Sequence, residues 1–293
     1  MIRCSGFFLT LAMTISALPQ SAAAEEWRGG GKLLLTGGVT SVEGAAGGGL
    51  ATWAVIAGDE TEAGIGGTAH LTYVALPDFD LTSYGAAIGF RNRIELSYAH
   101  QSFDTRSVGA MLGLGHGFTF SQDVFGAKLR LVGDAVYDQD RAMPQISIGV
   151  QHKRANQGAI IAAVGGKASN GTDVYVSATK VVLSRSLVVN ATLRFTKANQ
   201  LGLLGFGGDK SIKYQPEFEG SAGVLLTRRL LAGVEYRTKP DNLGFAEEDD
   251  TYDLFAAWSV ARHVALTAAW VDLGNIATVK RQRGAFLSVQ GSF

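Results

Sequence analysis

The feature that most constrains the fold is an alternation of apolar and polar side chains along most of the chain after about residue 50. In one such segment, Leu187, Val189 and Leu193 alternate with Asn190 and Arg194. Successive side chains of a β-strand point to opposite faces, so each segment of this kind predicts a strand with one apolar and one polar face. The pattern recurs up to the C-terminus, which predicts an all-β chain.

About fourteen strands are predicted, and twelve to sixteen fit the pattern because strand boundaries read from sequence shift by several residues. The predicted strands span residues 50–57, 66–75, 82–90, 93–103, 120–133, 144–154, 158–165, 172–182, 186–197, 216–227, 230–238, 251–260, 263–272 and 283–293.

The apolar faces of these strands are better explained by lipid than by a soluble core. After residue 24 no apolar run approaches the length of a transmembrane helix, so only strands can span a membrane here. A water-soluble sandwich also alternates. Aromatic residues near the strand ends and a C-terminal Phe293 favour a membrane barrel. We therefore predict a transmembrane antiparallel up-and-down β-barrel.

The N-terminus has the features of a secretory signal peptide. Arg3 supplies a positive charge, residues 7–18 are mostly apolar, and Ala22-Ala23-Ala24 offers a cleavage site near Ala24. The predicted organisation is a signal peptide over residues 1–24, a glycine-rich N-terminal segment over 25–49 and the barrel over 50–293.

Composition excludes several kinds of site. The single cysteine, Cys4, lies in the signal peptide, so the exported chain has no disulfide and no cysteine-based metal site. The 26 basic and 26 acidic residues balance, which argues against nucleic acid as a partner. No H-x-x-x-H spacing occurs, and we predict neither a metal nor another cofactor.

Connection lengths predict which barrel end faces the periplasm. Short turns are expected at residues 155–157, 183–185, 228–229 and 261–262, and short turns are typical of the periplasmic end. Longer external loops are expected at residues 134–143, 166–171, 198–215, 239–250 and 273–282.

Two parts of the N-terminal half fit this scheme less well. Residues 104–119 are expected to form a long periplasmic connection with a short helix or a further strand pair. Residues 25–49 fit a first strand, a periplasmic tail or a segment folded into the lumen.

The last strand resembles the C-terminal signal of bacterial outer-membrane proteins. Leu287, Val289 and Phe293 match its alternating pattern with an aromatic end, whereas Gly291 departs from it. The resemblance implies that Phe293 is part of a signal read by the barrel assembly machinery. It also implies residence in the bacterial outer membrane, with lipid and lipopolysaccharide as partners.

A second resemblance lies near the N-terminus. The stretch from Gly31 to Leu50, which begins Gly-Lys-Leu-Leu-Leu-Thr-Gly-Gly-Val-Thr, resembles the opening of a proteobacterial family known only as a domain of unknown function. This resemblance implies an outer-membrane barrel and carries no assigned activity.

The polar strand faces are predicted to line the lumen with both charges. A ring of one sign would select ions, whereas a mixed lining fits a salt-bridged interior or a weakly selective pore. The predicted lumen residues are Glu95, Lys128, Arg130, Asp173, Arg194, Glu217, Glu219, Glu235, Arg237 and Asp253.

His100 and Ser102 form the one candidate catalytic pair. They lie two residues apart, on one strand face with Tyr98, and a serine beside a base can attack a lipid ester. The stretch is similar to the His-x-Ser arrangement of outer-membrane phospholipase A, in which an Asn-Gly stretch follows; here Phe103 and Asp104 follow. The alternative is a pair of interfacial polar residues near a strand end.

Two loop segments also draw attention. Residues 247–250, Glu-Glu-Asp-Asp, could bind calcium through carboxylate oxygens, although a solvated loop is the commoner meaning of such a run. The apolar stretch from Leu201 to Phe206 should be covered in water, so a lumen-folded or interfacial place is expected for it.

Three functions remain open from sequence alone. The first is a passive channel or transporter for small, perhaps apolar, solutes, and we take it as the leading hypothesis. The second is a lipid-acting hydrolase at Ser102 and His100. The third is a structural barrel with a plugged lumen.

Overall fold

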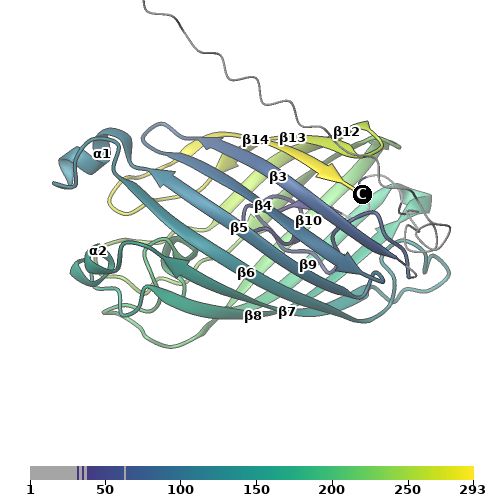
Figure 1. The fold of residues 1–293 in the computed structure, drawn as a ribbon, viewed down its shortest axis with the longest axis horizontal. Helices are drawn as coiled ribbons and strands as arrows, with labels where there is room; N and C mark the ends of the chain where they lie inside the picture. Colours follow the sequence, from purple (N-terminus) through teal and green to yellow (C-terminus); the bar gives the residue numbers. More distant parts are fainter. Residues whose placement is uncertain (1–31, 33–34, 36–37, 63) are drawn as a thin grey trace, which may run out of the picture.

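A closed barrel of twelve antiparallel strands, β3 to β14, makes up most of the molecule (Figure 1). The computed structural model describes Lys32, Leu35, residues 38–62 and residues 64–293; the predicted signal peptide lies outside these residues. Each strand pairs with its neighbours in the chain, and β14 pairs with β3 to close the barrel.

The barrel strands are β3 (Ile65–Ala75), β4 (Asp80–Phe90), β5 (Ile94–Asp104), β6 (Thr119–Val132), β7 (Gln145–Ala155), β8 (Asn170–Val182), β9 (Leu187–Thr196), β10 (Gln215–Thr227), β11 (Leu230–Arg237), β12 (Thr251–Ala261), β13 (Val264–Asp272) and β14 (Arg283–Ser292). The remaining elements are β1 (Val39–Thr40), β2 (Ala46–Gly47), α1 (Arg106–Met111), α2 (Gly158–Ala163), η2 (Leu183–Arg185) and η3 (Asn199–Gly202).

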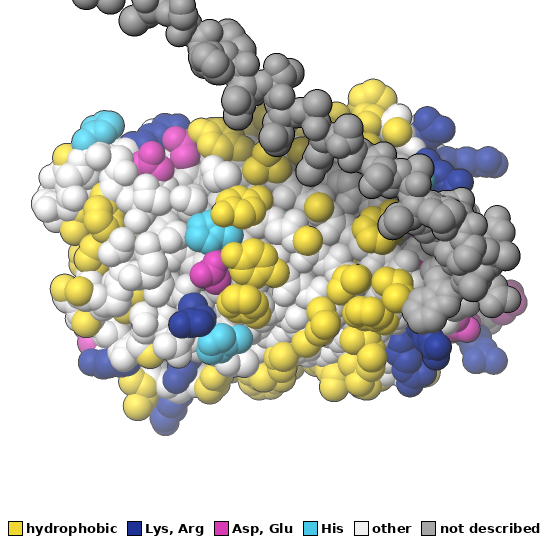
Figure 2. Space-filling view, in the orientation of Figure 1, with side chains coloured by type: hydrophobic (Ala, Val, Ile, Leu, Met, Phe, Trp, Pro, Cys, Tyr) yellow, Lys and Arg dark blue, Asp and Glu magenta, His cyan; other side chains and the backbone are white. Residues whose placement is uncertain are grey.

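The barrel is inverted relative to a soluble protein, with charged side chains inside and apolar side chains outside. In β12, Leu254 and Trp258 are 55% and 53% exposed, whereas Asp253, the neighbour of Leu254, is 2% exposed. Hydrophobic side chains lie openly over much of the visible barrel wall (Figure 2). An antiparallel ring leaves no strand edge unpaired, so such a wall suits a hydrocarbon environment. Among the described residues, no helix is both long and apolar enough to cross a membrane.

The predicted barrel is confirmed, but two of the fourteen expected strands are wrong. Residues 50–57 are not part of the wall; they lie buried inside the barrel. Residues 158–165 hold the helix α2 in place of a strand. A short apolar run does not by itself distinguish a strand from a buried helix or coil, and α2 is rich in alanine, the strongest helix former.

Because the expected strand at residues 158–165 is absent from the barrel wall, three connections lie at the opposite end of the barrel from the one predicted. Residues 134–143 lie at the barrel end that holds the C-terminus, although an external loop was expected there. Residues 155–157 lie where β7 leads into the β7–β8 connection, at the end of the barrel opposite the C-terminus. A short periplasmic turn, at the same end as the C-terminus, was expected for them. Residues 104–119, which include α1, also lie at that opposite end. Removing one strand reverses the side of every connection before it.

The two ends of the barrel therefore differ. At the C-terminal end, four of the five hairpin connections are two to four residues long, as in the two-residue β10–β11 turn. The opposite end, called the loop end below, holds α1, α2 and η3 and the longer connections (Figure 1). By turn length, the C-terminal end corresponds to the periplasmic end of outer-membrane barrels.

Candidate functional site

Residues 38–60, called the plug below, fill the barrel interior (Figure 1). β1 and β2 pair as a short hairpin whose turn contains Glu43. The turn needs glycine at position 44, because its φ is +89° and a Cβ there would come 3.0 Å from the Tyr98 carbonyl oxygen. This turn brings Glu43 against the inner wall.

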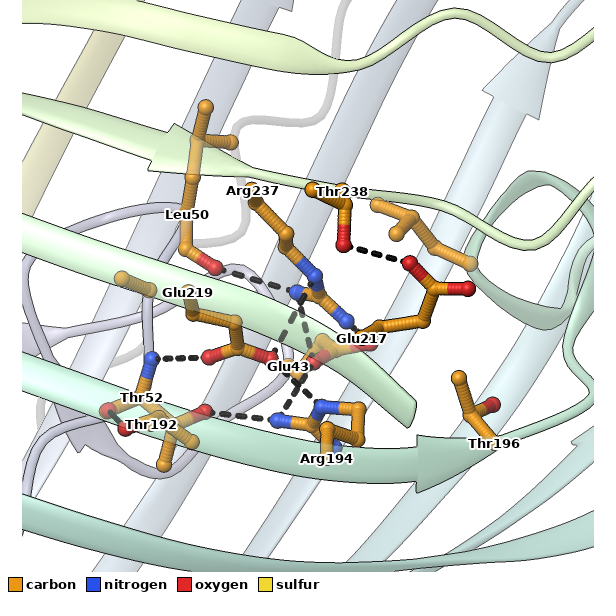
Figure 3. Close-up of polar contacts among 12 residues, drawn as sticks. Glu43, Leu50, Thr52, Thr192, Arg194, Thr196, Glu217, Glu219, Arg237 and Thr238 are labelled. Atoms are coloured by element: carbon orange, nitrogen blue, oxygen red, sulfur yellow. Dashed lines mark hydrogen bonds and ion pairs between the residues drawn. The ribbon is translucent and has the colours of Figure 1, made fainter. Parts of the chain in front are cut away.

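Glu43 is fully buried among three cations of the wall, and Figure 3 shows two of them, Arg194 and Arg237. Arg237 donates to Glu43 Oε2 at 3.0 Å, Lys153 donates to Oε1, and Arg194 lies 3.7 Å from Oε2. Burial by itself would raise the pKa of Glu43, but these three cations hold that pKa well below its usual range. The carboxylate is therefore charged at neutral pH.

Two wall carboxylates complete the cluster around Arg194. Arg194 Nε donates to Glu219 Oε1 at 2.5 Å, and Asp173 Oδ2 lies 2.9 Å from Lys153 Nζ. Three carboxylates, including Glu43, thus face three cations, and this cluster is balanced only with the plug in place. The mixed lining forms a salt-bridged interior in this structure.

Wall carboxylates also bind the backbone of the plug. Thr52 N donates to Glu219 Oε2 at 2.7 Å, and Leu50 N donates to Glu235 Oε2 at 2.8 Å. Ala57 N donates to Glu95 Oε2 at 2.8 Å. A segment without regular secondary structure must satisfy its buried amides elsewhere, and here side chains of the wall do so. The plug and the inner wall are therefore one hydrogen-bonded unit.

A loop covers this unit at the loop end. In η3, Gln200 and Leu201 both have positive φ, 46° and 59°, a conformation that side-chain-bearing residues seldom adopt. The Leu201 carbonyl accepts hydrogen bonds from Lys153 at 3.1 Å and from Gln122 at 3.3 Å. Lys153 therefore contacts both Glu43 of the plug and the covering loop.

An apolar cavity of about 370 Å³, called the chamber below, lies at the loop end. Each of the six connections at this end contributes at least one lining residue, for example Phe79, Val108, Ile160, Leu203 and Phe245. No residue that lines the chamber is charged. A concave, largely apolar cavity formed by convergent loops is the usual form of a small-molecule site.

The two polar lining side chains are already hydrogen-bonded within the protein. Thr105 Oγ1 donates to the Phe118 carbonyl at 2.7 Å. Gln200 Nε2 donates to Glu248 at 2.8 Å and to the Asn275 carbonyl at 3.2 Å. Phe79 and the chamber residue Phe103 stack with ring centroids 5.0 Å apart. The chamber therefore offers a ligand shape and aromatic surface more than hydrogen bonds.

Comparison with known proteins identifies the family. The family model described as "Protein of unknown function (DUF3034)" matches residues 36–290. The chain belongs to this family. No curated protein matches it. The coarse prediction of an uncharacterised family of outer-membrane barrels is thereby confirmed.

Solved structures similar to this DUF3034 chain are outer-membrane barrels. The KdgM porin in complex with disordered oligogalacturonate has a TM-score of 0.50 and 12% identity, over 77% of this chain and 99% of that chain. The NanC porin has a TM-score of 0.50 and 9% identity, over 77% and 98%. Outer membrane phospholipase A from Escherichia coli has a TM-score of 0.42 and 9% identity, over 76% and 92%. The two porins support the barrel fold, and none of these likenesses assigns an activity.

The structure places all ten predicted lumen residues in the barrel interior, each at most 9% exposed. Arg194, Arg237, Asp173 and Glu219 belong to the Glu43 cluster. The others have partners outside this cluster: Glu95 pairs with Lys128, Arg130 with Asp134, Glu217 with Thr238, and Glu235 with Ser221. One carboxyl oxygen of Asp253 has no hydrogen-bond partner among the described residues.

Sequence reasoning did not single out Glu43. Its signal was nonetheless present, because Glu43 is the only charged residue between positions 33 and 58. A lone carboxylate in a glycine-rich, apolar segment needs a buried cation as partner. Two of its actual partners, Arg194 and Arg237, were among the predicted lumen residues.

The DUF3034 barrel keeps His100 and Ser102 on one outer strand face near the loop end. His100 Nδ1 lies 2.9 Å from Asp123 Oδ1 on β6, and Tyr98 donates to the same oxygen at 2.8 Å. Within the described part of the chain, no hydrogen bond joins Ser102 to His100. The structure therefore adds an orienting carboxylate that the sequence did not reveal.

The acidic run at residues 247–250 does not act as one cluster. Glu248 is directed inward to Lys239 and Gln200, and its pKa is raised by burial. Asp250 instead accepts a hydrogen bond from Tyr236. Over the described residues, no group of three or more His, Cys, Asp or Glu side chains is arranged to hold a metal ion.

We predict that Glu43→Gln loosens the plug, because it leaves buried wall cations without their shared carboxylate. Breaking a buried ion pair costs about 3–5 kcal/mol. In planar bilayers the wild-type barrel should show no steady ion current, and the variant should show measurable openings. Glu62→Gln, which removes a charge from an 83% exposed side chain, is the control and should behave as wild type. A variant as silent as wild type would show that Glu43 does not hold the plug.

Glu60, at the other end of the plug, predicts a pH dependence of stability. Burial raises the pKa of Glu60 to about 7, despite Lys32 Nζ at 3.4 Å. The protonated acid is thus favoured in the folded state. Its stabilising contribution is complete below the ordinary value of 4.5 and is lost as pH rises through about 7.

Glu60→Gln should abolish this loss, which amounts to at most about 3 kcal/mol. The measurement is the urea midpoint of unfolding at pH 4.5 and at pH 8, in wild type, in Glu60→Gln and in the Glu62→Gln control. An unchanged difference between the two pH values in Glu60→Gln would contradict the assignment.

Proposed function

We propose that this DUF3034 barrel takes up small apolar solutes through the outer membrane and binds them first in the chamber. The observation that carries the proposal is the convergence of all six loop-end connections on one uncharged apolar cavity of about 370 Å³. An apolar chamber open to water would be unfavourable without an apolar occupant. Its place at the loop end, which we assign to the cell exterior, suits capture from outside.

The chemistry of the lining favours neutral solutes. A carboxylate entering the chamber would lose its hydration and find no cation to replace it. A small aromatic hydrocarbon has no such hydration to lose and would pack against the apolar lining. Phe79, Phe103 and Phe120 provide ring surfaces for such a solute. The hydrogen bonds of Thr105 and Gln200 inside the protein leave few groups to recognise a polar one.

The plug makes this barrel closed at rest. Below the chamber, the covering loop, Lys153 and Glu43 form a continuous set of contacts. Passage of a solute therefore requires rearrangement of the plug, which distinguishes the proposal from a permanently open channel. A structural barrel with a plugged lumen would share the plug but would have no use for the chamber.

Ile160→Trp should block the chamber, because the larger side chain on α2 fills space that the solute needs. Naphthalene binding, measured by equilibrium dialysis against empty micelles, should weaken at least about tenfold. Ala162→Trp, on the exposed face of the same helix, should bind as wild type does. Naphthoate should bind wild type at least about tenfold less tightly than naphthalene. Equal binding by both tryptophan variants, or a preference for naphthoate, would refute the proposal.

A second candidate function is hydrolysis of a lipid ester at the outer face. The hydrogen bond between His100 and Asp123 favours it, because a carboxylate that orients a histidine allows it to act as a base toward a nearby serine. Ser102 would attack the ester carbonyl carbon while His100 takes the hydroxyl proton and passes it to the departing alcohol as the ester bond breaks. Water, activated by the same histidine, would then cleave the acyl-serine to release the fatty acid and restore Ser102. The lipid-facing position supplies the substrate without a binding pocket.

Ser102→Ala decides this second candidate. If the site is catalytic, purified barrel in mixed micelles should release fatty acid from phospholipid, and the variant should lose at least about a hundredfold of that rate. Ser121 lies directly opposite on β6, and Ser121→Ala should keep the wild-type rate. Absence of release from wild type, or equal release from both variants, would eliminate a hydrolase.

A further inference from the structure

Arginines occupy each of the four short connections at the C-terminal end of the barrel. These connections join β4 to β5, β8 to β9, β10 to β11 and β12 to β13. The last three are consecutive around the barrel. All six side chains are exposed; together we call them the arginine rim: Arg91, Arg93, Arg185, Arg228, Arg229 and Arg262.

The part of the chain that the structure describes supplies no counter-ion to the arginine rim. None of the four connections contains an acidic residue, and no ion pair to a rim side chain is present among the described residues. The loop end is different, because Arg106 pairs with Asp80 and Arg283 pairs with Asp272, each at 2.5 Å. The arginines of the short connections are therefore available to an external anion.

The arginine rim lies where the apolar wall ends. Exposed hydrophobic side chains stand within a few residues of each connection: Ile94 (45% exposed), Leu183 (38%), Leu226 (60%) and Val264 (38%). Figure 2 shows Lys and Arg side chains at the right-hand end of the barrel, beside hydrophobic side chains. With the apolar wall in hydrocarbon, the guanidinium groups reach the level of lipid headgroups.

We propose that the arginine rim binds the phosphate headgroups of anionic phospholipids in the leaflet at the C-terminal end. A guanidinium group matches a phosphate with two parallel hydrogen bonds, which lysine cannot do, and the four connections contain arginine but no lysine. Basic groups at a membrane surface attract anionic lipid, and the effect accumulates with their number. This lipid site is independent of the chamber, so it stands or falls apart from the proposed function.

The test uses the full-length folded protein and phosphatidylglycerol as the probe. Native mass spectrometry counts bound lipid during titration with phosphatidylglycerol or with zwitterionic phosphatidylcholine. We expect wild type to prefer phosphatidylglycerol. We also expect R185Q/R228Q/R229Q/R262Q to bind it at least about tenfold less tightly, with phosphatidylcholine binding unchanged. The control R154Q/K167Q/K213Q/R281Q removes the same charge from exposed positions at the loop end and should bind phosphatidylglycerol as wild type does.

Three results would overturn the proposal. The first is no preference of wild type for phosphatidylglycerol. The second is an equal loss in the rim variant and the control variant, which would indicate an effect of net charge alone. The third is displacement of the lipid by millimolar inorganic phosphate, which would make the rim a site for free anions. Circular dichroism verifies that each variant retains the folded barrel, since all eight positions are exposed.

Discussion

The structure depends on the neutralisation of buried charge around Glu43. A barrel wall that presents oily side chains to lipid must turn its polar side chains inward, and in this chain they carry full charges. Lys153, Arg194 and Arg237 converge on one level of the lumen, where their mutual repulsion in a medium of low polarity would be severe. The carboxylate of Glu43, which the plug places between these cations, offsets their mutual repulsion. The plug is therefore a component of the charge balance, as much as it is an obstacle in the lumen.

Because the plug supplies that carboxylate, the N-terminal segment and the wall must fold together. The plug backbone has little regular structure, and wall carboxylates such as Glu219, Glu235 and Glu95 accept its amide hydrogens. A water-filled lumen would satisfy those carboxylates without the plug. Their use as acceptors for backbone shows that the interior is built around a peptide, which a mixed-charge lining alone does not reveal.

The barrel could be predicted from sequence because its cause is local. Alternation over ten residues decides which face of a strand is apolar, and that property survives an error of a few residues at either boundary. The segment 50–57 failed for a nonlocal reason. Its apolar residues are as suited to a strand as to a buried coil, and the decisive partners of its amides lie more than thirty residues away. The other false strand, at residues 158–165, changed the side assigned to every earlier connection.

The candidate site was predicted only in part, for the same reason. The inward residues followed from the two-residue period, so Arg194 and Glu219 could be assigned to the lumen. That they surround a carboxylate of the N-terminal segment depended on the path of the plug. Likewise, the chamber gathers residues from six separate connections, and Phe79 and Ile276 are almost two hundred residues apart. No sequence window contains such a site.

The energies involved also limit how the chamber and the plug can be linked. A small aromatic solute of about ten heavy atoms gains at most about 1.5 kcal/mol per atom, and allosteric couplings typically amount to about 1–3 kcal/mol. Removing the whole plug would expose the Glu43 cluster and break the hydrogen bonds of the plug backbone to Glu219, Glu235 and Glu95. Each of these losses would cost about as much free energy as a typical allosteric coupling, or more.

The solute binding that we propose would therefore supply enough free energy to shift one contact, but not enough to expel the plug. The strained turn at Gln200 and Leu201 is suited to that role, because both residues hold a positive φ beside the hydrogen bond from Lys153 to the Leu201 carbonyl. Release of this one contact would free Lys153 on the side facing Glu43. A path past the β1–β2 turn, with residues 50–57 still bound to the wall, is the opening that these energies permit.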